Sequence, residues 1–458
     1  MSGSLELTTN VPLPPGPSGL PLVGSLFEVT RRGIIPVMEE CQARYGDVFL
    51  LKVAGLKLVV VAHPEGVERV LRGNRDNYVK GSIYDNLRQI AGEGLATVEG
   101  PSWRTRRKQL QPLFQNQRTL GAVGRLGTLV DETLEGWAKE VRDGDEVDLF
   151  EAFSPLTLRV ISELVCGVEL ADSRRLIGAF RDALENLVGR GNVERNIPLS
   201  IPTPGNVRAK RALATLDAMV YAEIDRAMAA GERRGDDLLG LLLTAKDDAG
   251  QPLTRREVRD ELVTMLLAGH ETVALTLVWA FERLGAHPEV LRALREEVDR
   301  VLVEGRPLDA AALHELQYTR RVVQEVLRVR SPAWIVARTC VADDEVCGFR
   351  VPAGATVLMT QHLLHHHPTY WREPERFDPE RFLPEASRGR NEYAYFPFSK
   401  GPRMCIGSHL GMVEATVAIA LMTRRLSFEP VGLEPVGFNA LNALHPSPPL
   451  RMRLRWRR

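Results

Sequence analysis

The decisive stretch of this chain is Phe398-Ser-Lys-Gly401-Pro-Arg403-Met-Cys405-Ile-Gly407. It places a cysteine between two glycines, beside an arginine and just ahead of a long apolar run. A cysteine binds metals as the thiolate, and the run at 408–422 predicts a helix whose positive N-terminal end would stabilise that charge. The glycines permit backbone conformations that other residues avoid. The segment therefore predicts a thiolate ligand to a metal, although a free cysteine is more often a small buried hydrophobic residue.

The composition describes a balanced globular protein. The chain has 458 residues, of which 44% are hydrophobic, so it can bury a sizeable core. Its 59 basic and 59 acidic residues cancel, which argues against a general nucleic-acid binder. An odd, scattered set of 5 cysteines is not a disulfide framework and suits a reducing cytoplasm. These are Cys41, Cys166, Cys340, Cys347 and Cys405.

The order of patterns along the chain predicts one large, mainly helical domain over residues 1–458 with a small β region. Residues 1–20 include a proline-rich run that predicts an extended N-terminal segment. Strands are predicted at 48–53 and 56–61, helices from about 65 to 330, and strands again at 340–346 and 355–359, with a turn at 347–354. The most apolar run, 262–281, contains an ionisable His-Glu pair, which favours a core helix over a membrane span. No membrane anchor is expected.

All fixed positions of the pattern F-x-x-G-x-R-x-C-x-G are filled, and the segment resembles the haem-binding loop of the cytochromes P450. The resemblance implies the P450 fold: a single large domain, mainly α with a small β region, with the haem buried between two helices. It implies haem b, iron protoporphyrin IX, with Cys405 as the iron ligand. Phe398, Gly401 and Gly407 would then lie against the haem and its sulfur ligand. Ligation by a thiolate favours O–O cleavage.

A second motif, Glu325-Val-Leu-Arg328, lies in a helical pattern over 318–329. Its two charged residues share a helix face, where a surface ion pair is the ordinary interpretation. In P450s such a pair meets the arginine of a Pro-Glu-Arg-Phe loop. That tetrapeptide occurs twice here, and the copy at 379–382 is preferred because an aromatic residue precedes it. The predicted structural triad is Glu325, Arg328 and Arg381, with Arg376 of the first copy as the alternative to Arg381.

Four residues match the positions that bind the haem propionates in the family. Trp103 and Arg107 are four residues apart and share a face of a helix for which Ser102 is a candidate cap. Alone, such a basic stretch is usually a solvated face, but an indole N–H and a guanidinium suit a buried carboxylate. Arg338 and Arg403 match the two other positions.

The long apolar helix carries Ala268-Gly-His270-Glu-Thr272, which resembles the oxygen-activation motif A/G-G-x-D/E-T of the P450s. A glycine within a helix costs about 1 kcal/mol relative to alanine, and a threonine can bond to its own helix backbone. The resemblance implies a groove beside Gly269 that admits O2, with Thr272 donating to the distal oxygen and Glu271 relaying protons. Ala268 and Gly269 would contact the haem, and His270 has no assigned role. A tolerated irregularity in a core helix is the alternative.

The stretch 361–367 holds four histidines and could be taken for a metal-binding tract. Nothing else supports a zinc site, because adjacent histidines splay apart. The segment from His365 to Trp371 is similar to a family stretch usually written H-R-D-P-x-x-W. Here His366 and His367 replace the arginine and the aspartate, which predicts weaker local ion pairing and a structural role.

The resemblance implies a soluble bacterial enzyme of the cytoplasm. It would insert one oxygen atom from O2 into a hydrophobic small molecule, as in the hydroxylations of secondary metabolism. Fatty acids, terpenoids, steroids and polyketides all stay open as substrates. By family position, residues 82–95, 264–268, 333–336 and 439–444 are candidates for lining the pocket. Too few residues follow Cys405 for a fused reductase, so a separate ferredoxin or flavodoxin with its reductase is expected, and the protein is expected to be a monomer.

A basic face is the candidate docking surface for an acidic redox partner, although scattered solvated charge explains its residues about as well. It would comprise Arg104, Arg106, Lys108, Arg320, Arg321 and Lys400. Three other functions stay open. They are a peroxide-using or isomerase/dehydratase haem-thiolate enzyme, a haem-based sensor, and a carrier of hydrophobic ligands without haem. The Glu271-Thr272 pair argues against peroxide, because peroxide users need no proton relay to split O2.

Overall fold

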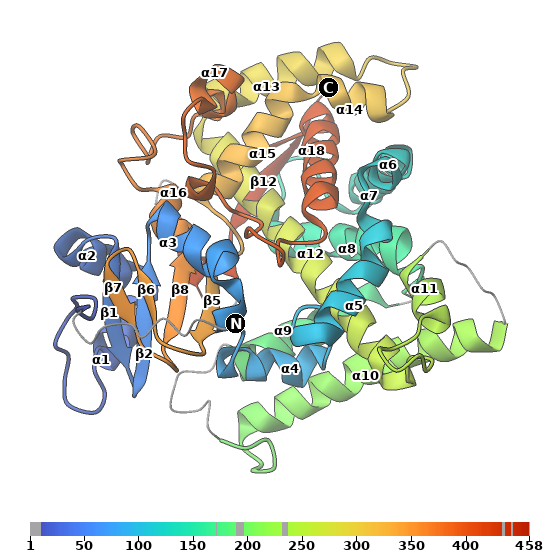
Figure 1. Cartoon of the computed structure of the whole chain (residues 1–458). Helices are drawn as coiled ribbons and strands as arrows, with labels where there is room; N and C mark the ends of the chain where they lie inside the picture. Colours follow the sequence, from blue (N-terminus) through green and yellow to red (C-terminus); the bar gives the residue numbers. More distant parts are fainter. Residues whose placement is uncertain are drawn as a thin grey trace. The chain divides into compact units, whose positions relative to one another are not determined.

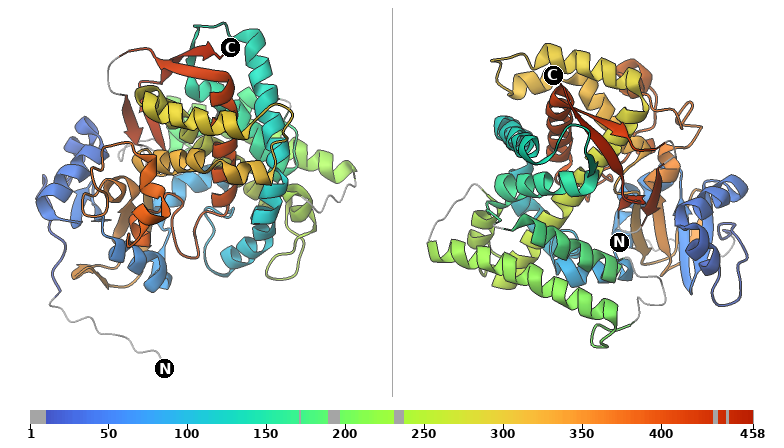
Figure 2. Two further views of the ribbon diagram at one scale, coloured as in Figure 1. Left: turned by 90° about the horizontal axis from the view of Figure 1, so that it is seen from above. Right: turned by 180° about the vertical axis from the view of Figure 1, so that it is seen from behind.

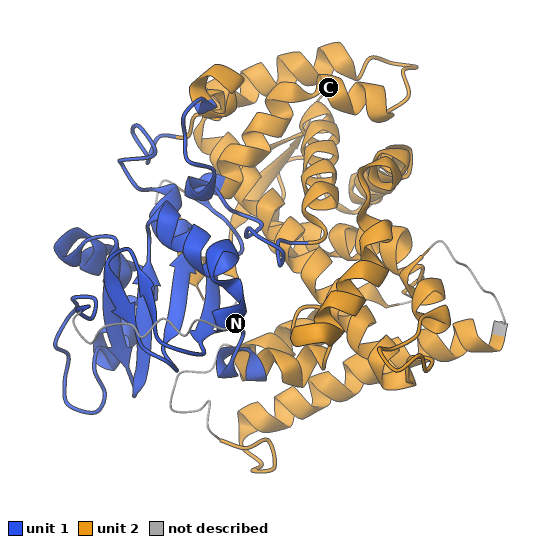
Figure 3. Cartoon of the chain, in the orientation of Figure 1, with its two compact units in different colours: residues 1–85, 328–376, 387–405 blue, residues 86–327, 377–386, 406–458 orange. Residues whose placement is uncertain are grey.

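The computed structural model describes residues 11–170, 172–188, 197–230, 237–432, 436–440 and 443–457 (Figure 1). Internal contacts divide the chain into two compact units, each assembled from separate stretches (Figure 3). Unit 1 comprises 1–85, 328–376 and 387–405, and unit 2 comprises 86–327, 377–386 and 406–458. The single domain expected over 1–458 stays a prediction. Residues 1–10 of the predicted N-terminal segment and 441–442 of the predicted pocket lining lie outside the described residues.

Unit 1 is built on a five-stranded sheet in the order β1-β2-β8-β5-β3. β1 (Val48–Val53) and β2 (Leu56–Val61) form an antiparallel hairpin at the predicted positions. β2 pairs in parallel with β8 (Thr356–Thr360), whereas β5 (Ile335–Cys340) pairs antiparallel with β8 and with β3 (Tyr78–Val79). Most residues of β1, β2 and β8 are buried, as expected for strands covered on both faces.

The second half of the β region differs from the prediction. The strand expected at 340–346 is divided, because β5 ends at Cys340 and β6 (Asp344–Val346) pairs with β7 (Phe349–Val351). Cys347 and Gly348 form the two-residue loop with φ of 52° and 79°. Positive φ at both positions is the geometry that reverses a tight hairpin, so part of the expected turn is itself a strand.

Residues 11–19 of the N-terminal segment are in neither a helix nor a strand, and the extended form expected for residues 1–20 stays a prediction. The carbonyl of Pro15 accepts the N–H of Leu50 at 2.8 Å, and that of Pro12 accepts the N–H of Arg350 at 2.9 Å. Because proline has no N–H, each of these two residues accepts a hydrogen bond through its carbonyl and has no backbone donor that needs a partner. The helices of unit 1 are α1 (Leu26–Arg32), α2 (Ile34–Tyr45), α3 (Pro64–Glu68) and α16 (Gln361–His365).

Unit 2 is organised around α12 (Arg255–Ala286), which contains the apolar run of 262–281. A capping box starts the helix: Thr254 accepts the N–H of Glu257, and the Glu257 carboxylate accepts the N–H of Thr254. α12 is long and apolar enough to cross a membrane, but 83% of its most apolar 18-residue window is buried inside the protein. That burial is typical of the core helix predicted from the His-Glu pair.

Helices on several sides of α12 complete unit 2 (Figure 1). Those that contact α12 directly include α8 (Leu149–Ile161), α10 (Pro204–Ala230) and α18 (Ser408–Arg425). Figure 2 shows from two further directions how the C-terminal strands follow the end of α18. β4 (Glu146–Asp148), β12 (Arg451–Trp456) and β9 (Leu426–Pro430) form one small sheet, and β10 (Gly437–Ala440) pairs with β11 (Leu444–Ser447). Three helices include one or two residues assigned to unit 1: α4 (Asp85–Ala91), α15 (Gln317–Val329) and α17 (Pro384–Ser387). The helices are α4 (Asp85–Ala91), α5 (Gly100–Leu110), α6 (Asn116–Gly121), α7 (Val123–Glu140), α8 (Leu149–Ile161), α9 (Ser173–Ala183), α10 (Pro204–Ala230), α11 (Leu238–Thr244), α12, α13 (Pro288–Val301), α14 (Ala310–Glu315), α15 (Gln317–Val329), α17 (Pro384–Ser387) and α18 (Ser408–Arg425).

Candidate functional site

The segment from Phe398 to Cys405 forms a closed loop in unit 1. The N–H of Cys405 donates to the carbonyl of Phe398 at 2.9 Å. Gly401 has φ +72°, and a Cβ there would lie 2.3 Å from the carbonyl oxygen of Leu71. Only glycine fits this position, because any side chain would meet both an unfavourable backbone conformation and a steric clash. Cys405 is exposed within this closed loop, so its thiol is accessible to a metal.

The second glycine of the motif has a different setting. Gly407 is the N-cap of α18, with φ −89°. A Cβ at Gly407 would approach the ring of Phe114 to 3.7 Å, which is ordinary van der Waals contact. The fold therefore requires glycine at Gly401 but not at Gly407, where close approach to a cofactor remains the predicted reason for glycine.

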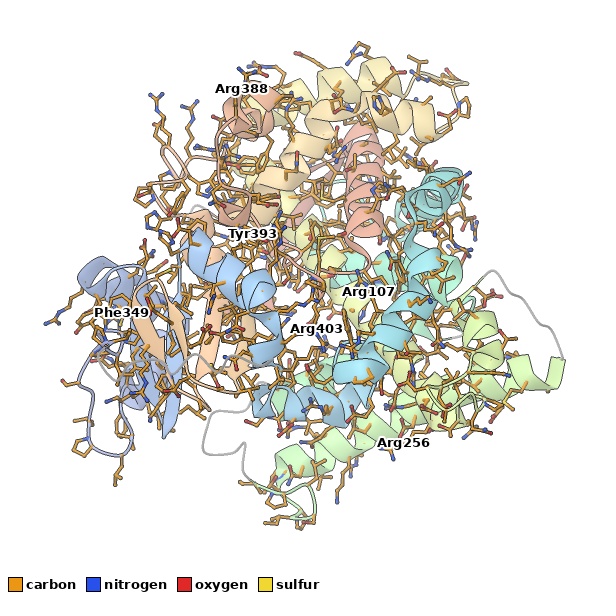
Figure 4. The ribbon with its side chains drawn as sticks, in the orientation of Figure 1. Arg107, Arg256, Phe349, Arg388, Tyr393 and Arg403 are labelled. Carbon is orange, nitrogen blue, oxygen red and sulfur yellow. The ribbon has the colours of Figure 1, made fainter. Side chains whose placement is uncertain are left out.

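Unit 1 carries two of the residues assigned to the propionates. Arg338 lies on β5 and is only 6% exposed. Its Nη1 donates to the carbonyl of Ala337 at 2.7 Å and lies 3.4 Å from the hydroxyl oxygen of Tyr84. A guanidinium has five N–H donors, so donors remain for a carboxylate. Arg403 is partly buried in the loop that precedes α18 (Figure 4).

Unit 2 carries the other two, on α5. Trp103 and Arg107 are both partly buried, and the indole of Trp103 packs against the main hydrophobic core of the unit. Figure 4 labels Arg107 on this helix. The predicted cap is wrong: Glu99 is the N-cap residue, and Ser102 lies inside the helix with its hydroxyl donating to Asp248 at 3.2 Å. A glycine-proline start permits the helix to begin earlier than the serine.

Between Val258 and Leu284, the described residues of α12 are accessible only in the middle of the helix and at the partly exposed Arg283. Ala268 is exposed, and Gly269 and Thr272 are partly exposed. Thr272 Oγ1 donates to the carbonyl of Ala268 at 2.9 Å, the helix-backbone bond expected from the sequence. These three residues are close enough along the helix to give one small, mainly apolar face.

The groove expected beside Gly269 is not where the missing side chain would point. A Cβ on Gly269 would lie 2.5 Å from Cγ1 of Ile161, at the end of α8. Ile161 thus occupies that space, and the glycine has a packing reason: it lets α8 approach α12 closely. The space for O2 stays a prediction, and the accessible residues nearest to Gly269 on this helix are Ala268 and Thr272.

The acid of the motif has a partner that the sequence did not indicate. Glu271 is buried, and its Oε1 lies 3.0 Å from Nε2 of His445 on β11. The neighbouring His270 is buried, stacks on Phe180 and places Nδ1 2.9 Å from the carbonyl of Leu266. Burial lowers the pKa of His270, although the nearby Glu271 raises it, so this imidazole is neutral.

The proposed triad is divided between the two units at α15. Within unit 2, Glu325 is fully buried, accepts the N–H of Asp378 at 2.9 Å and lies 3.4 Å from Nε of Arg381. Arg381 is therefore the arginine at Glu325, whereas Arg376 is 64% exposed and beside Glu373. Within unit 1, the buried Arg328 donates to the carbonyls of His365 at 2.9 Å and Arg376 at 3.1 Å.

The histidines of α16 and its end have structural partners in unit 1. His365 Nε2 accepts the N–H of Phe396 at 3.0 Å, just ahead of the cysteine loop. His366 Nδ1 lies 2.8 Å from the carbonyl of His362, and His367 Nε2 lies 2.8 Å from Asp47. Burial lowers the pKa of His366 well below its usual value. Among the described residues, no group of His, Cys, Asp and Glu could hold a metal ion.

Two further buried acids of α12, Asp260 and Glu261, are not among the residues predicted from the sequence. Asp260 accepts the N–H of Glu93 at 2.9 Å, and Glu261 accepts the N–H of Leu95 at 3.1 Å. A Cβ on Gly92 would lie 2.1 Å from the Asp260 carboxylate, so the loop presses directly on the helix. This fastens part of the predicted pocket lining, 82–95, to α12. Consecutive acids at the start of an apolar helix were the available signal.

The expected basic face loses one member. Arg106 is 8% exposed, and its guanidinium donates to Glu257 at 2.8 Å and Glu261 at 3.1 Å. Arg104 and Lys108, on the same helix, are exposed. Arg106 therefore belongs to the buried network at the start of α12, and not to a docking surface.

Considered unit by unit, these residues suit a haem. Unit 1 offers an accessible thiol at Cys405 and a buried guanidinium at Arg338. Unit 2 offers an accessible apolar face at Ala268, together with the donors of Trp103 and Arg107. A thiolate, charge-assisted donors and an apolar surface are what an iron porphyrin with two carboxylates requires.

A family model described as cytochrome P450 matches residues 14–452. The chain is 32% identical over 417 residues to the cyclooctat-9-en-7-ol 5-monooxygenase of Streptomyces melanosporofaciens, covering 91% of this chain and 89% of that protein. It is 32% identical over 443 residues to the pentalenene oxygenase of Streptomyces avermitilis, covering 96% of each.

Solved structures show the same similarity. The haem domain of cytochrome P450DA superimposes with a TM-score of 0.86 at 25% identity, covering 98% of both chains. A cyanobacterial CYP120A1 with bound retinoic acid superimposes with a TM-score of 0.85 at 25% identity, covering 98% of this chain and all of that one.

Proposed function

This chain belongs to the cytochrome P450 family, and we propose that its substrate is a terpenoid. The predicted P450 fold, haem-iron cofactor and monooxygenase class are confirmed by that membership. Four substrate classes were open from the sequence. The terpenoid class is favoured because relatives at 32% identity over most of the chain are named for oxidising cyclooctat-9-en-7-ol and pentalenene. That observation carries the proposal.

The proposed cofactor is haem b, held by the thiolate of Cys405. The propionates would accept hydrogen bonds from Trp103, Arg107, Arg338 and Arg403, because charge-assisted donors stabilise buried carboxylates. When bound, the haem iron supplies the activation of O2 and the transfer of one oxygen atom to the substrate. Further residues proposed to contact the haem are Phe398, Gly401, Gly407, Ala268 and Gly269.

Protons are proposed to reach the reaction through Glu271 and Thr272. The buried carboxylate of Glu271 would hold a proton at Oε1, and the Thr272 hydroxyl would pass it on. A hydroxyl has a single O–H donor, so Oγ1 would have to rotate away from the carbonyl of Ala268 before donating to the reacting oxygen. This pair favours O2 over peroxide, and comparing turnover with peroxide against turnover with O2 and a reductase tests that choice.

A binding screen tests the substrate class. Cyclic terpenes and terpene alcohols, fatty acids, steroids and polyketide lactones of matched size would be titrated into the haem protein. Displacement of water from the iron is read as a shift of the haem absorbance. Terpenoids should give the largest shifts at the lowest concentrations and yield products with one added oxygen atom. Tight binding and oxidation confined to another class would contradict the proposal.

The enzyme is further proposed to act as a cytoplasmic monomer of a single domain over 1–458, with electrons from a ferredoxin or flavodoxin and its reductase. Arg104 and Lys108 of α5 and Arg320 of α15 are exposed and could meet an acidic partner. Docking through exposed charges weakens as salt rises. Reduction by a ferredoxin should therefore slow between low and moderate ionic strength. Reduction rates that do not change with salt would exclude these residues as the docking surface.

A further inference from the structure

The strand β11 (Leu444–Ser447) holds a histidine against the proposed proton-relay acid. Nε2 of His445 lies 3.0 Å from Oε1 of Glu271, a separation of 174 residues along the chain. The preceding residue is also fixed to α12, because Nε1 of Trp279 donates to the carbonyl of Leu444 at 2.8 Å. Two contacts from adjacent residues of the strand give His445 a defined position on this helix.

The two partners differ in access to water. The side chain of Glu271 is 10% exposed, whereas that of His445 is 32% exposed. The imidazole packs at an angle against Phe150, with ring centroids 5.1 Å apart. One ring nitrogen faces Glu271, and the other makes no hydrogen bond within the part of the chain that the structure describes. The ring thus links a buried carboxylate to the exterior.

We propose that His445 carries protons from solvent to Glu271. A hydronium ion or buffer acid protonates the ring at Nδ1, and the imidazolium releases its Nε2 proton to Oε1 of Glu271. The ring keeps the Nδ1 proton and regains its first tautomer by exchange with water. No other group moves. Imidazole suits this role because it exchanges protons near neutral pH, and the inference rests on the proposed role of Glu271.

The other histidine beside this acid cannot serve. His270 adjoins Glu271 in sequence, but it is 2% exposed and its Nδ1 is engaged by the carbonyl of Leu266. Burial also lowers its pKa. A ring that is neutral and shielded from water cannot collect protons, so the route through β11 is the one the geometry provides.

The test uses His445→Gln, Glu271→Gln and the double variant in the haem protein with O2, a reductase and a substrate found by the screen. Glutamine keeps an N–H for Glu271 but cannot carry a proton. The product formed per reductant consumed should fall roughly ten-fold in each single variant, below the full effect of losing a general acid. In the double variant, the product formed per reductant consumed should be no lower than in either single variant. The reductant that does not yield product should be recovered as peroxide.

Two readouts separate this role from a structural one. The absorbance of the reduced carbon monoxide complex should be unchanged, which shows that haem and thiolate are intact. Denaturant unfolding of the same four proteins should give losses that do not add, because contacting residues couple. His362→Gln is the matched control: Nε2 of His362 lies 2.8 Å from Oε1 of Glu39, and its loss should leave product per reductant unchanged.

The outcomes distinguish the two proposals. If Glu271→Gln diverts reductant to peroxide while His445→Gln behaves as wild type, His445 is not the carrier and the relay acid stands. If Glu271→Gln itself behaves as wild type, the proposed relay fails and the inference fails with it. The inference is also overturned if the two single-variant losses of product per reductant multiply in the double variant. Additive losses of unfolding free energy would overturn it as well. Should His445→Gln not fold, His445→Asn takes its place.

Discussion

The cysteine loop of unit 1 and the middle of α12 in unit 2 hold their chemistry by different means. In the loop, the closing bond from Cys405 to Phe398 joins residues of the same short segment. On α12, Glu271 is held by a residue 174 positions away, and Glu261 holds a loop 166 positions away. Contacts within one segment appear in the sequence as a recognisable motif. Contacts between distant segments involve residues that are separated in the sequence and form no motif.

The difference also bears on robustness. A loop closed by its own backbone depends on a few backbone geometries, such as φ +72° at Gly401. A helix face completed from other elements depends on the packing of each of those elements. Substitutions that separate the effect of local sequence from that of distant contacts are therefore the informative ones.

The two Pro-Glu-Arg-Phe copies share the same tetrapeptide but differ in the distant contacts of their arginines. Arg381→Ala removes the cation beside the fully buried Glu325, which should cost about 3–5 kcal/mol of unfolding free energy. Arg376→Ala removes a side chain that is 64% exposed and should cost less than about 0.5 kcal/mol. Denaturant unfolding with haem content measures both. Equal losses of unfolding free energy would mean that the contact with Glu325 does not determine which of the two arginines stabilises the fold.

The acid at Glu261 predicts an unusual dependence of stability on pH. Burial raises its pKa from 4.5 to about 7, although Arg106 and the N–H of Leu95 lower it. An acid whose pKa is higher in the folded state stabilises that state in its protonated form. The stabilisation is complete below pH 4.5 and is lost as the pH rises through 7. The shift corresponds to on the order of 3 kcal/mol.

The measurement compares wild type with Glu261→Gln, which cannot ionise. Between pH 5 and 8, the unfolding free energy of wild type should fall relative to that of the variant. The variant's own loss of the bond to Arg106 is an offset that does not change with pH. A difference that stays constant over this range would show that Glu261 is ionised throughout.

The two glycines of the cysteine motif, Gly401 and Gly407, are in different settings. Gly401→Ala should destabilise unit 1 by about 2 kcal/mol, because the left-handed backbone and the contact with Leu71 both oppose a side chain. Gly407→Ala should cost less than about 1 kcal/mol, since its Cβ meets only an ordinary contact. Thermal unfolding of both variants would show this order, and an equal response would refute the steric argument.

The smallest effect on stability is expected for Thr272→Ala, within about 0.5 kcal/mol, because the hydroxyl only doubles a helix-backbone bond. Its effect on the reaction should be larger. Reductant consumption should continue while the oxygen is released as peroxide, measured as product and peroxide per reductant. Unchanged coupling of electrons to product would remove Thr272 from the mechanism.

The sequence allowed prediction where the determinants lie within one segment. β1 and β2 occur at the predicted residues, and α18 begins at Ser408 as expected. Arg106 was misjudged because its partners Glu257 and Glu261 lie about 150 residues away, so its basic neighbours suggested a surface. His445 was missed for the same reason. A single sequence does not record which distant residues touch.

The central claim is that Cys405 is the thiolate ligand of a haem iron. The direct measurement is the absorbance of the reduced carbon monoxide complex of wild type, Cys405→Ser and Cys347→Ser. Cys347 is the matched control, since it is the other exposed free cysteine of the described chain. The strongly red-shifted band should be present in wild type and Cys347→Ser and absent in Cys405→Ser. Its survival in Cys405→Ser, or a colourless wild-type protein even when haem is supplied, would contradict the account.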